Sequence, residues 1–148
     1  MESVIVRKAK KEDQQQLLAL MNEYIVDFYN CPKPAGEKLE RLVLQLLERE
    51  IGFQFIAEVN GNLVGFATLY FSFSTTKAEQ IVVMNDLYVI EPLRGKGVAK
   101  LLFEACFAYK VNNGFATMMW ETAETNKRAQ RFYEKMGGKK GDWIMYSI

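Results

Sequence analysis

The sequence predicts a single α/β (α+β) domain, residues 1–148, in which a mixed, mostly antiparallel central sheet is flanked by about four helices. Apolar runs of strand and helix periodicity follow one another in the order β-α-α-β-β-β-α-β-α-β. Asn60-Gly61-Asn62 separates two apolar runs, and Asn-Gly at such a place is a strong hairpin signal. The unit from Ile81 to Glu121 reads strand, turn, helix and strand, which predicts a right-handed crossover between parallel strands.

The N-terminal third is predicted to form one strand and two helices. Residues Val4 to Val6 are β-branched and indicate a first strand that ends at Arg7. Asp13 can cap a helix, which must end before Cys31 because prolines follow at positions 32 and 34. The apolar face of this helix holds Leu17, Leu20, Met21, Tyr24, Ile25 and Phe28. A second helix, Glu37 to Glu50, has its apolar stripe at Leu39, Leu42, Val43, Leu46 and Leu47.

The middle of the chain is predicted to form three strands, at Phe53–Val59, Leu63–Phe73 and Ile81–Val89. The hairpin signal makes the first two antiparallel neighbours, and the polar segment 74–80 is expected to be a loop. A helical period then runs from Gly97 to Asn112-Asn113-Gly114, where glycine suits a left-handed C-cap.

The C-terminal part is predicted to form a strand, a helix and a last strand. The first strand is short, from Thr117 to Glu121. Thr125 or Asn126 then caps a helix that ends at Gly137-Gly138. Trp143 to Ile148 is expected to close the chain as a strand.

Composition excludes several classes of function. The 19 Lys and Arg balance 18 Asp and Glu, so no overall field attracts nucleic acid or a membrane surface. The absence of histidine rules out Ser-His and Cys-His catalysis and the usual His-containing zinc sites, and no metal is expected. Cys31 and Cys106 have neither metal-ligand nor disulfide spacing. With no signal peptide or spanning segment in the sequence, the expected location is the cytoplasm.

The stretch from Asn85 to Lys100 is the predicted centre of the site. An apolar strand ends in the glycine-rich turn Arg94-Gly95-Lys96-Gly97-Val98-Ala99, and a helix begins there. A helix N-terminus presents unpaired N–H groups and a partial positive charge to an anion, and glycine lets a diphosphate approach the backbone. The spacing matches neither the P-loop nor the dinucleotide fingerprint. This stretch is therefore expected to hold the pyrophosphate of a nucleotide-type cofactor.

Two spaced signatures in the sequence resemble those of a known family. Arg94 to Ala99 matches [RQ]-x-x-G-x-[GA], and Asn126 to Gly137 matches N-x-x-A-x-x-x-Y-E-x-x-G. Both belong to the GNAT superfamily of acetyl-CoA-dependent N-acetyltransferases. The segment D-L-Y-V-x-x-x-x-R-G-K-G, with Trp120-Glu121 and a late Trp143, looks most like the spermidine/spermine (diamine) acetyltransferase branch. That branch also implies a homodimer.

The resemblance implies a GNAT-like fold in which acetyl-CoA lies in a V-shaped opening between the fourth and fifth strands. The pantetheine arm would pair with the backbone of Leu87, Tyr88 and Val89. Asn126 and Tyr133 would also contact the cofactor. The pyrophosphate would take N–H groups from the turn, and the expected cofactor-binding residues there are Arg94, Gly95, Lys96, Gly97, Val98, Ala99 and Lys100.

The expected catalytic residues are Tyr133, Leu87 and Asp86. A phenol with a pKa near 10 can protonate a departing thiolate with a pKa of about 8 to 9, so Tyr133 is the candidate general acid. The backbone N–H of Leu87 is the candidate oxyanion donor by family resemblance. Asn85 stands where the polyamine branch has Glu, and an amide cannot accept the proton of the amine. Strand alternation is expected to send Asn85 and Asp86 to opposite faces, which leaves direct attack by neutral amine or a water relay open.

The acceptor is predicted to be a small primary amine such as a polyamine, a diamine or an amino-acid side chain. Tyr24, Phe28, Asn85 and Glu121 are the candidate acceptor-binding residues, since they offer aromatic surface, an amide and a carboxylate. Two alternatives remain open. One is acetylation of a protein or peptide amine or of an aminoglycoside, and the other is a non-catalytic acyl-CoA-binding module.

Overall fold

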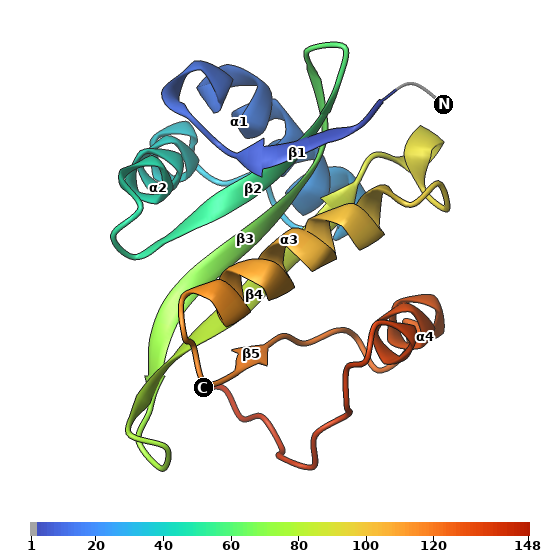
Figure 1. Ribbon diagram of the computed structural model, residues 1–148. Helices are drawn as coiled ribbons and strands as arrows, with labels where there is room; N and C mark the ends of the chain where they lie inside the picture. The colour runs from blue at the N-terminus through green and yellow to red at the C-terminus, as the bar shows by residue number, and fades with distance from the viewer. Residues whose placement is uncertain (1–2) are drawn as a thin grey trace.

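A five-stranded sheet forms the centre of the computed structural model, which describes residues 3–148 (Figure 1). The strands lie in chain order, and the first four pair as antiparallel neighbours while the last pair is parallel. Their bounds are β1 Ile5–Lys8, β2 Gly52–Val59, β3 Asn62–Ser74, β4 Glu79–Val89 and β5 Met118–Met119. The mixed, mostly antiparallel sheet predicted from the sequence is confirmed.

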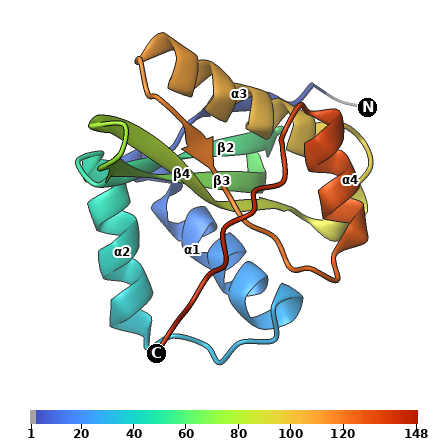
Figure 2. The same ribbon diagram turned by 90° about the horizontal axis from the view of Figure 1, so that it is seen from below.

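Helices cover both faces of this sheet (Figure 2). Helices α1 and α2 lie on one face and α3 on the other, while α4 stands beside the open end of β4. The bounds are α1 Gln14–Asn22, α2 Gly36–Glu48, α3 Val98–Asn112 and α4 Lys127–Lys135, with short 3-10 helices at Lys11–Asp13 and Glu91–Leu93. Within residues 3–148, every helix is too short or too polar to cross a membrane.

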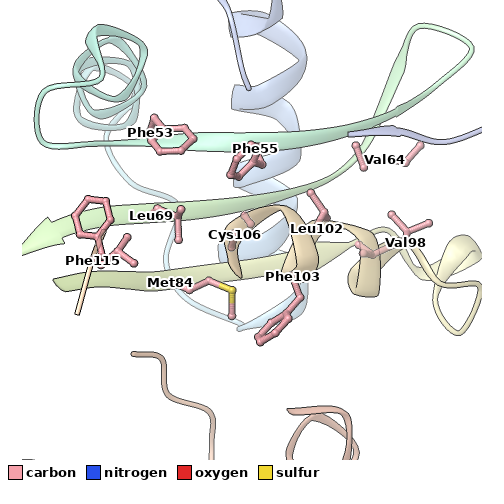
Figure 3. Packing of buried hydrophobic residues seen from close by; sticks show 14 residues of the cluster. Phe53, Phe55, Val64, Leu69, Met84, Val98, Leu102, Phe103, Cys106 and Phe115 are labelled. Carbon is pink, nitrogen blue, oxygen red and sulfur yellow. The ribbon is translucent and has the colours of Figure 1, made fainter. Parts of the chain in front are cut away.

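Two apolar layers hold the helices to the sheet. On the α3 side, strand residues such as Phe53 and Leu69 meet Leu102 and Cys106 of the helix (Figure 3). On the other face, Phe66 belongs to the cluster that includes residues of α1 and α2. Burying each large apolar side chain contributes about 1.5–3 kcal/mol, so both layers fix the sheet on which the site is built.

The first helix changes its hydrogen bonding before it ends. After Asn22 the chain continues as a π-helix, η2, over Glu23–Phe28. The N–H of Tyr29 donates to the carbonyl of Tyr24 at 3.1 Å, the i to i+5 spacing of a π-turn. The predicted end before Cys31 is confirmed, but the sequence period did not reveal the wider turn. Wide turns of this kind often occur at functional sites.

The prediction of a last strand at Trp143–Ile148 was wrong. The structure has no regular element there, and Trp143 and Tyr146 are 93% and 90% exposed. An apolar run becomes a strand only when a neighbouring edge completes its hydrogen bonds. The adjacent β5 is two residues long, shorter than the predicted Thr117–Glu121, and offers little edge.

The short β5 also opens the sheet. Val82 and Val83 of β4 pair with Met118 and Met119, and no further pairs join the two strands. Among the residues that the structure describes, no strand pairs with the outer edge of β4 from Met84 to Val89. This is the V-shaped opening that was predicted between the fourth and fifth strands.

Candidate active site

A cleft of about 750 Å³ lies along this open edge, and residues of β4 and α4 form part of its wall. It brings together fourteen residues that the sequence singled out, from the first helix, β4, the glycine turn and α4. They are Tyr24, Phe28, Asn85, Leu87, Tyr88, Val89, Arg94, Gly95, Gly97, Ala99, Lys100, Glu121, Asn126 and Tyr133. Residues distant in sequence thus form one continuous surface.

Three predicted site residues do not line the cleft: Asp86, Lys96 and Val98. The side chain of Val98 is 1% exposed and packs in the α3-side core, so only its backbone could face a ligand. Lys96 is exposed outside the cleft wall. Asp86 is partly buried and accepts a hydrogen bond from Asn85, which lines the cleft.

The glycine turn has the conformation that its residues were expected to permit. Gly95 and Gly97 have φ values of +78° and +89°, in the left-handed region that favours glycine. Gly97 is the N-cap of α3, so the first N–H groups of a fifteen-residue helix begin at this wall of the cleft. Such a terminus suits a bound anion.

Arg94 fastens the turn to the end of β4. Its Nε donates to the carbonyl of Val89 at 2.9 Å. Its guanidinium lies 5.1 Å from the ring centre of Phe28 and 5.5 Å from that of Tyr88. These cation–π contacts join the first helix, β4 and the turn, so the side chain has a structural task besides any contact with an anion.

Helix α4 forms the opposite wall. Asn126 caps it, with Oδ1 accepting from the N–H of Ala129 at 3.1 Å. Tyr133 packs against Trp120, with ring centres 5.4 Å apart, and burial raises the pKa of Tyr133 to about 12. A Cβ at Gly138 would lie 2.6 Å from the Trp120 ring, so this glycine permits the close approach of α4 to that ring.

Nine residues of the cleft wall were not among the predicted site residues. Arg128 is the most informative, because its Nη2 would lie 3.6 Å from a Cβ built at Gly95, which places a cation beside the anion turn. Its position within the second signature was the available signal. Tyr29 reaches the cleft through the π-helix, which the apolar period did not indicate. The others are Met84, Leu93, Thr122, Ala129, Phe132, Lys135 and Met136.

A β-bulge lies in the cleft wall at Asn85. Asp86 is opposite Thr68 and Met84 is opposite Leu69, so Asn85 is an extra residue on β4. The expectation that Asn85 and Asp86 face opposite sides was wrong, because a bulge interrupts side-chain alternation. Asn85 Nδ2 donates to Asp86 Oδ1 at 3.1 Å. The bulge thus directs a carboxylate toward the first helix while Asn85 stays in the cleft.

Asp86 is a partly buried acid. Burial raises its pKa, while the polar neighbours Thr68, Tyr24 and Asn85 act in the opposite direction. Burial also raises the pKa of Tyr24, and the charge of Asp86 adds to this effect. Within residues 3–148, no group of three or more His, Cys, Asp or Glu is placed to hold a metal ion.

Comparisons with known proteins identify the family of this chain. The model of the acetyltransferase (GNAT) family matches residues 17–138. The uncharacterized N-acetyltransferase YhfO of Bacillus subtilis is 32% identical over 132 residues, which cover 89% of this chain and 87% of YhfO. The D-amino-acid N-acetyltransferase HPA3 of Saccharomyces cerevisiae is 28% identical over 97% of this chain and 89% of that protein.

The fold is shared with a solved acetyltransferase. The aminoglycoside N-acetyltransferase AAC(6')-Iy, bound to the bisubstrate analogue CoA-S-monomethyl-acetylneamine, superposes with a TM-score of 0.86. The two chains are 19% identical, and the match covers 99% of this chain and 98% of the other. With the family match over residues 17–138, the chain belongs to the acetyltransferase (GNAT) family and is an acetyl-CoA-dependent N-acetyltransferase.

Proposed function

We propose that this single-domain enzyme transfers the acetyl group of acetyl-CoA directly to a primary amine of a small molecule, such as a polyamine, a diamine or an amino acid. One observation carries the proposal: the anion turn, the unpaired edge of β4 and Tyr133 line the same cleft. A cofactor arm laid along that edge would run from the turn toward the partly buried phenol of Tyr133.

The cofactor end is supported by charge and backbone geometry. The pyrophosphate takes N–H groups at the start of α3, with Lys100 and Arg128 as nearby cations. The pantetheine arm pairs with the outer edge of Leu87, Tyr88 and Val89, which no described strand occupies. Lys96 and Val98 contribute through the backbone of the turn, since neither side chain lines the cleft.

The chemical step needs a polarised carbonyl and a proton for the leaving group. The amine nitrogen attacks the thioester carbon, the N–H of Leu87 stabilises the oxyanion, and Tyr133 protonates the departing sulfur. Because burial raises the pKa of Tyr133 to about 12, the phenol carries its proton throughout the neutral range.

The cysteines favour direct attack over an acyl-enzyme. Cys106 is 0% exposed, and burial raises the pKa of its thiol to about 12. Cys31 is exposed but does not line the cleft. Neither thiol meets the requirements of a nucleophile, which must be ionised and within reach of the thioester.

The acceptor end combines aromatic surface with negative charge. Tyr24, Phe28 and Tyr29 come from η2 and its end, and Glu121 follows β5. A cationic amine on an apolar chain suits this combination. The similarity to HPA3, named for D-amino acids, supports an amino-acid-like acceptor.

The test is thiol release from acetyl-CoA over a panel of diamines, polyamines, amino acids, peptides and an aminoglycoside. The wild type is expected to turn over small amines, and Tyr133→Phe is expected to lower kcat by about 10²-fold or more with cofactor affinity kept. Tyr109→Phe, in the core outside the cleft, is the control. Turnover of peptides alone would show that the acceptor is a peptide amine rather than a small molecule. Cofactor binding without turnover of any amine would favour the non-catalytic acyl-CoA-binding module.

We also infer a homodimer that works in the cytoplasm. The resemblance to the diamine acetyltransferase branch supports the dimer, and so do the exposed apolar side chains of the C-terminal segment, residues 142–148. The two free cysteines suit a reducing compartment. The dimer is tested below, and fractionation of cells that express the tagged chain tests the compartment.

A further inference from the structure

Helix α4 carries the general acid of the proposed function without a deeply buried residue of its own. No residue of Lys127–Lys135 is buried, and Phe132 and Tyr133 are partly buried side chains that pack against the α3-side core. A partly buried side chain gains less from burial than a core residue does. The place of Tyr133 in the cleft therefore depends on the particular contacts that hold this helix.

The C-terminal cap of α4 is bonded to the backbone of Tyr133. The N–H of Gly138 donates to the carbonyl of Tyr133 at 2.9 Å, and the N–H of Gly137 donates to that of Glu134 at 3.0 Å. With Gly137 at a φ of +95°, these two bonds form a Schellman motif. A shift of Gly138 would therefore move the residue that carries the acid.

The indole ring of Trp120 lies against both the cap and the Tyr133 ring. A Cβ built at Gly138 would lie 2.6 Å from Cζ2 and 3.1 Å from Cη2 of Trp120. The ring centres of Trp120 and Tyr133 are 5.4 Å apart, with the planes inclined by 52°. Phe103 of α3, which is 3% exposed, meets the Trp120 ring edge-on with centres 5.3 Å apart. Trp120 thus connects a buried residue of α3 with the cap of α4 and with the phenol.

The glycine at position 138 is required by close packing and not by the backbone turn. Gly137 has a positive φ, and a Cβ there would meet nothing within 4 Å. Gly138 lies outside the left-handed region, but a Cβ there would also be 3.0 Å from the Tyr133 carbonyl oxygen. The nearest atom belongs to the Trp120 ring, so ring and cap can meet because position 138 has no side chain. The second family signature ends at Gly137 and gives Gly138 no role.

We propose that Trp120 is a positioning residue for the general acid, because it holds the Tyr133 hydroxyl within reach of the leaving sulfur. This inference rests on the proposed function, in which Tyr133 protonates that sulfur. Trp120 does not line the cleft, so it acts on the reaction through Tyr133 and not through a substrate. A general acid must lie within hydrogen-bond reach of the atom that it protonates, and a displacement of about 1 Å can cost about 10²-fold in rate.

The test is a double-mutant cycle between positions 120 and 133, measured by steady-state kinetics and by single-turnover acetyl transfer. Trp120→Leu, which removes the ring, should lower kcat by about tenfold or more and leave both KM values within about threefold of the wild type. In a Tyr133→Phe background the same substitution should lower kcat by less than about twofold, because no phenol hydroxyl is left to position. Trp143→Leu is the matched control, since Trp143 is 93% exposed and does not line the cleft, and its kinetics are expected to match the wild type.

A second set of variants tests the contact itself. Gly138→Ala places a methyl group against the Trp120 ring and should lower kcat by about tenfold. Adding Trp120→Phe removes the ring atoms nearest to that methyl group and should raise the kcat of Gly138→Ala by about threefold or more. Trp120→Phe alone should stay within about threefold of the wild type, because a phenyl ring still packs on Tyr133. Gly141→Ala is the control, since its Cβ meets nothing within 4 Å and its φ is not positive.

Three results would overturn the positioning role while the proposed function stood. One is an unchanged kcat in Trp120→Leu. Another is an equal loss from Trp120→Leu with and without the Tyr133 hydroxyl, which would mean that the ring supports only the fold. The third is a loss in Gly138→Ala that Trp120→Phe does not relieve, which would show that the Tyr133 carbonyl alone requires the glycine.

Thermal unfolding checks that each variant is folded at the assay temperature. If Trp120→Leu fails to fold, the comparison of Gly138→Ala with and without Trp120→Phe decides. A wild type that acetylates no amine, or a Tyr133→Phe variant as fast as the wild type, would instead overturn the proposed function and, with it, the role of Trp120.

Discussion

At the scale of single residues, the partial burial of Asp86 acts against the fold at neutral pH. Burial raises its pKa in the folded chain above the unfolded value. Its contribution to stability is therefore fully present below the unfolded pKa and is lost as pH rises through the folded pKa. At neutral pH the buried charge weakens the fold, as acids at functional sites often do.

We expect Asp86→Asn to raise the free energy of unfolding at pH 7 by about 0.5–2 kcal/mol, the usual size of a stabilising substitution. The gain should disappear below about pH 4, where the wild-type carboxyl is protonated in both states. Urea unfolding at several pH values measures this difference. Glu79→Gln, which changes an exposed carboxylate on the same strand, should stay within about 0.5 kcal/mol. A destabilised Asp86→Asn at pH 7 would show that the carboxylate strengthens the fold.

Two separate requirements favour glycine at position 97: the backbone has a positive φ, and a diphosphate is expected to approach it closely. Its φ is +89°, and a Cβ there would meet no protein atom within 4 Å. Gly97→Ala should therefore cost only the backbone strain, about 1–2 kcal/mol of unfolding free energy. CoA affinity should fall by about tenfold or more, because the turn no longer admits a diphosphate as closely.

Calorimetric titration with CoA and thermal unfolding measure the two effects of Gly97→Ala. Gly36→Ala is the matched control, since its Cβ also meets nothing within 4 Å and its φ is not positive. Equal CoA affinity in Gly97→Ala and the wild type would place the pyrophosphate elsewhere.

At the level of elements, β1 and the first helix are tied by one buried acid. Asp13 Oδ2 and Oδ1 accept from Arg7 at 2.7 and 2.9 Å, and Oδ2 also accepts from the N–H of Lys10 at 2.9 Å. The hydrogen bond to Arg7 is the main reason that the pKa of Asp13 is lowered. This stabilisation is present above the unfolded pKa and is lost as pH falls through the folded value.

Asp13→Asn should lower the free energy of unfolding at neutral pH by about 1.5–3 kcal/mol, the range for hydrogen bonds to charged groups. The difference from the wild type should shrink as pH drops below about 4, because both chains then lack the carboxylate. Denaturation across pH measures it. Glu37→Gln removes an exposed partner of Arg41 at 4.0 Å and should change stability by less than about 0.5 kcal/mol. If Asp13→Asn lost the same unfolding free energy at every pH, the packing of the side chain rather than its charge would be responsible.

Elements set by local interactions could be predicted from the sequence, whereas elements set by contacts between distant segments could not. The hairpin at Asn60-Gly61 and the end of the first helix before Pro32 are local, and both were predicted. The bulge at Asn85 depends on pairing with β3, and the missing last strand depends on how much of β5 forms. No local pattern carries either property. The same holds in the site, where the glycine turn was predicted but the hydrogen bond from Asn85 to Asp86 was not.

At the level of the whole molecule, cofactor site and acceptor site are built on different supports. The anion turn begins α3, whose inner face packs in one core layer, whereas Tyr24 extends from the helix above the other layer. Both layers pack on the sheet, and Ile90, just after β4, contacts both of them. The open edge of β4 lies where both supports meet, so the bulge can redirect Asp86 without disturbing the turn.

The C-terminal segment provides the last prediction. Trp143, Ile144, Met145 and Tyr146 are each at least 73% exposed, an apolar run that a soluble monomer rarely leaves uncovered. We expect the full chain to be a dimer in which these side chains are buried, and Trp143→Ser with Ile144→Ser to shift it toward the monomer. Residues 142–148 do not line the cleft, so the CoA affinity of the double variant should be unchanged.

Sedimentation at protein concentrations that span a hundredfold range measures the shift between dimer and monomer. A hundredfold range corresponds to about 2.7 kcal/mol of association free energy. Ser147→Ala, a small change in the same segment, is the control. In a Trp120→Phe background the fluorescence of Trp143 should report its burial as the dimer forms. A chain that stays monomeric throughout, or a double variant that dimerises as well as the wild type, would show that this segment does not hold the dimer together.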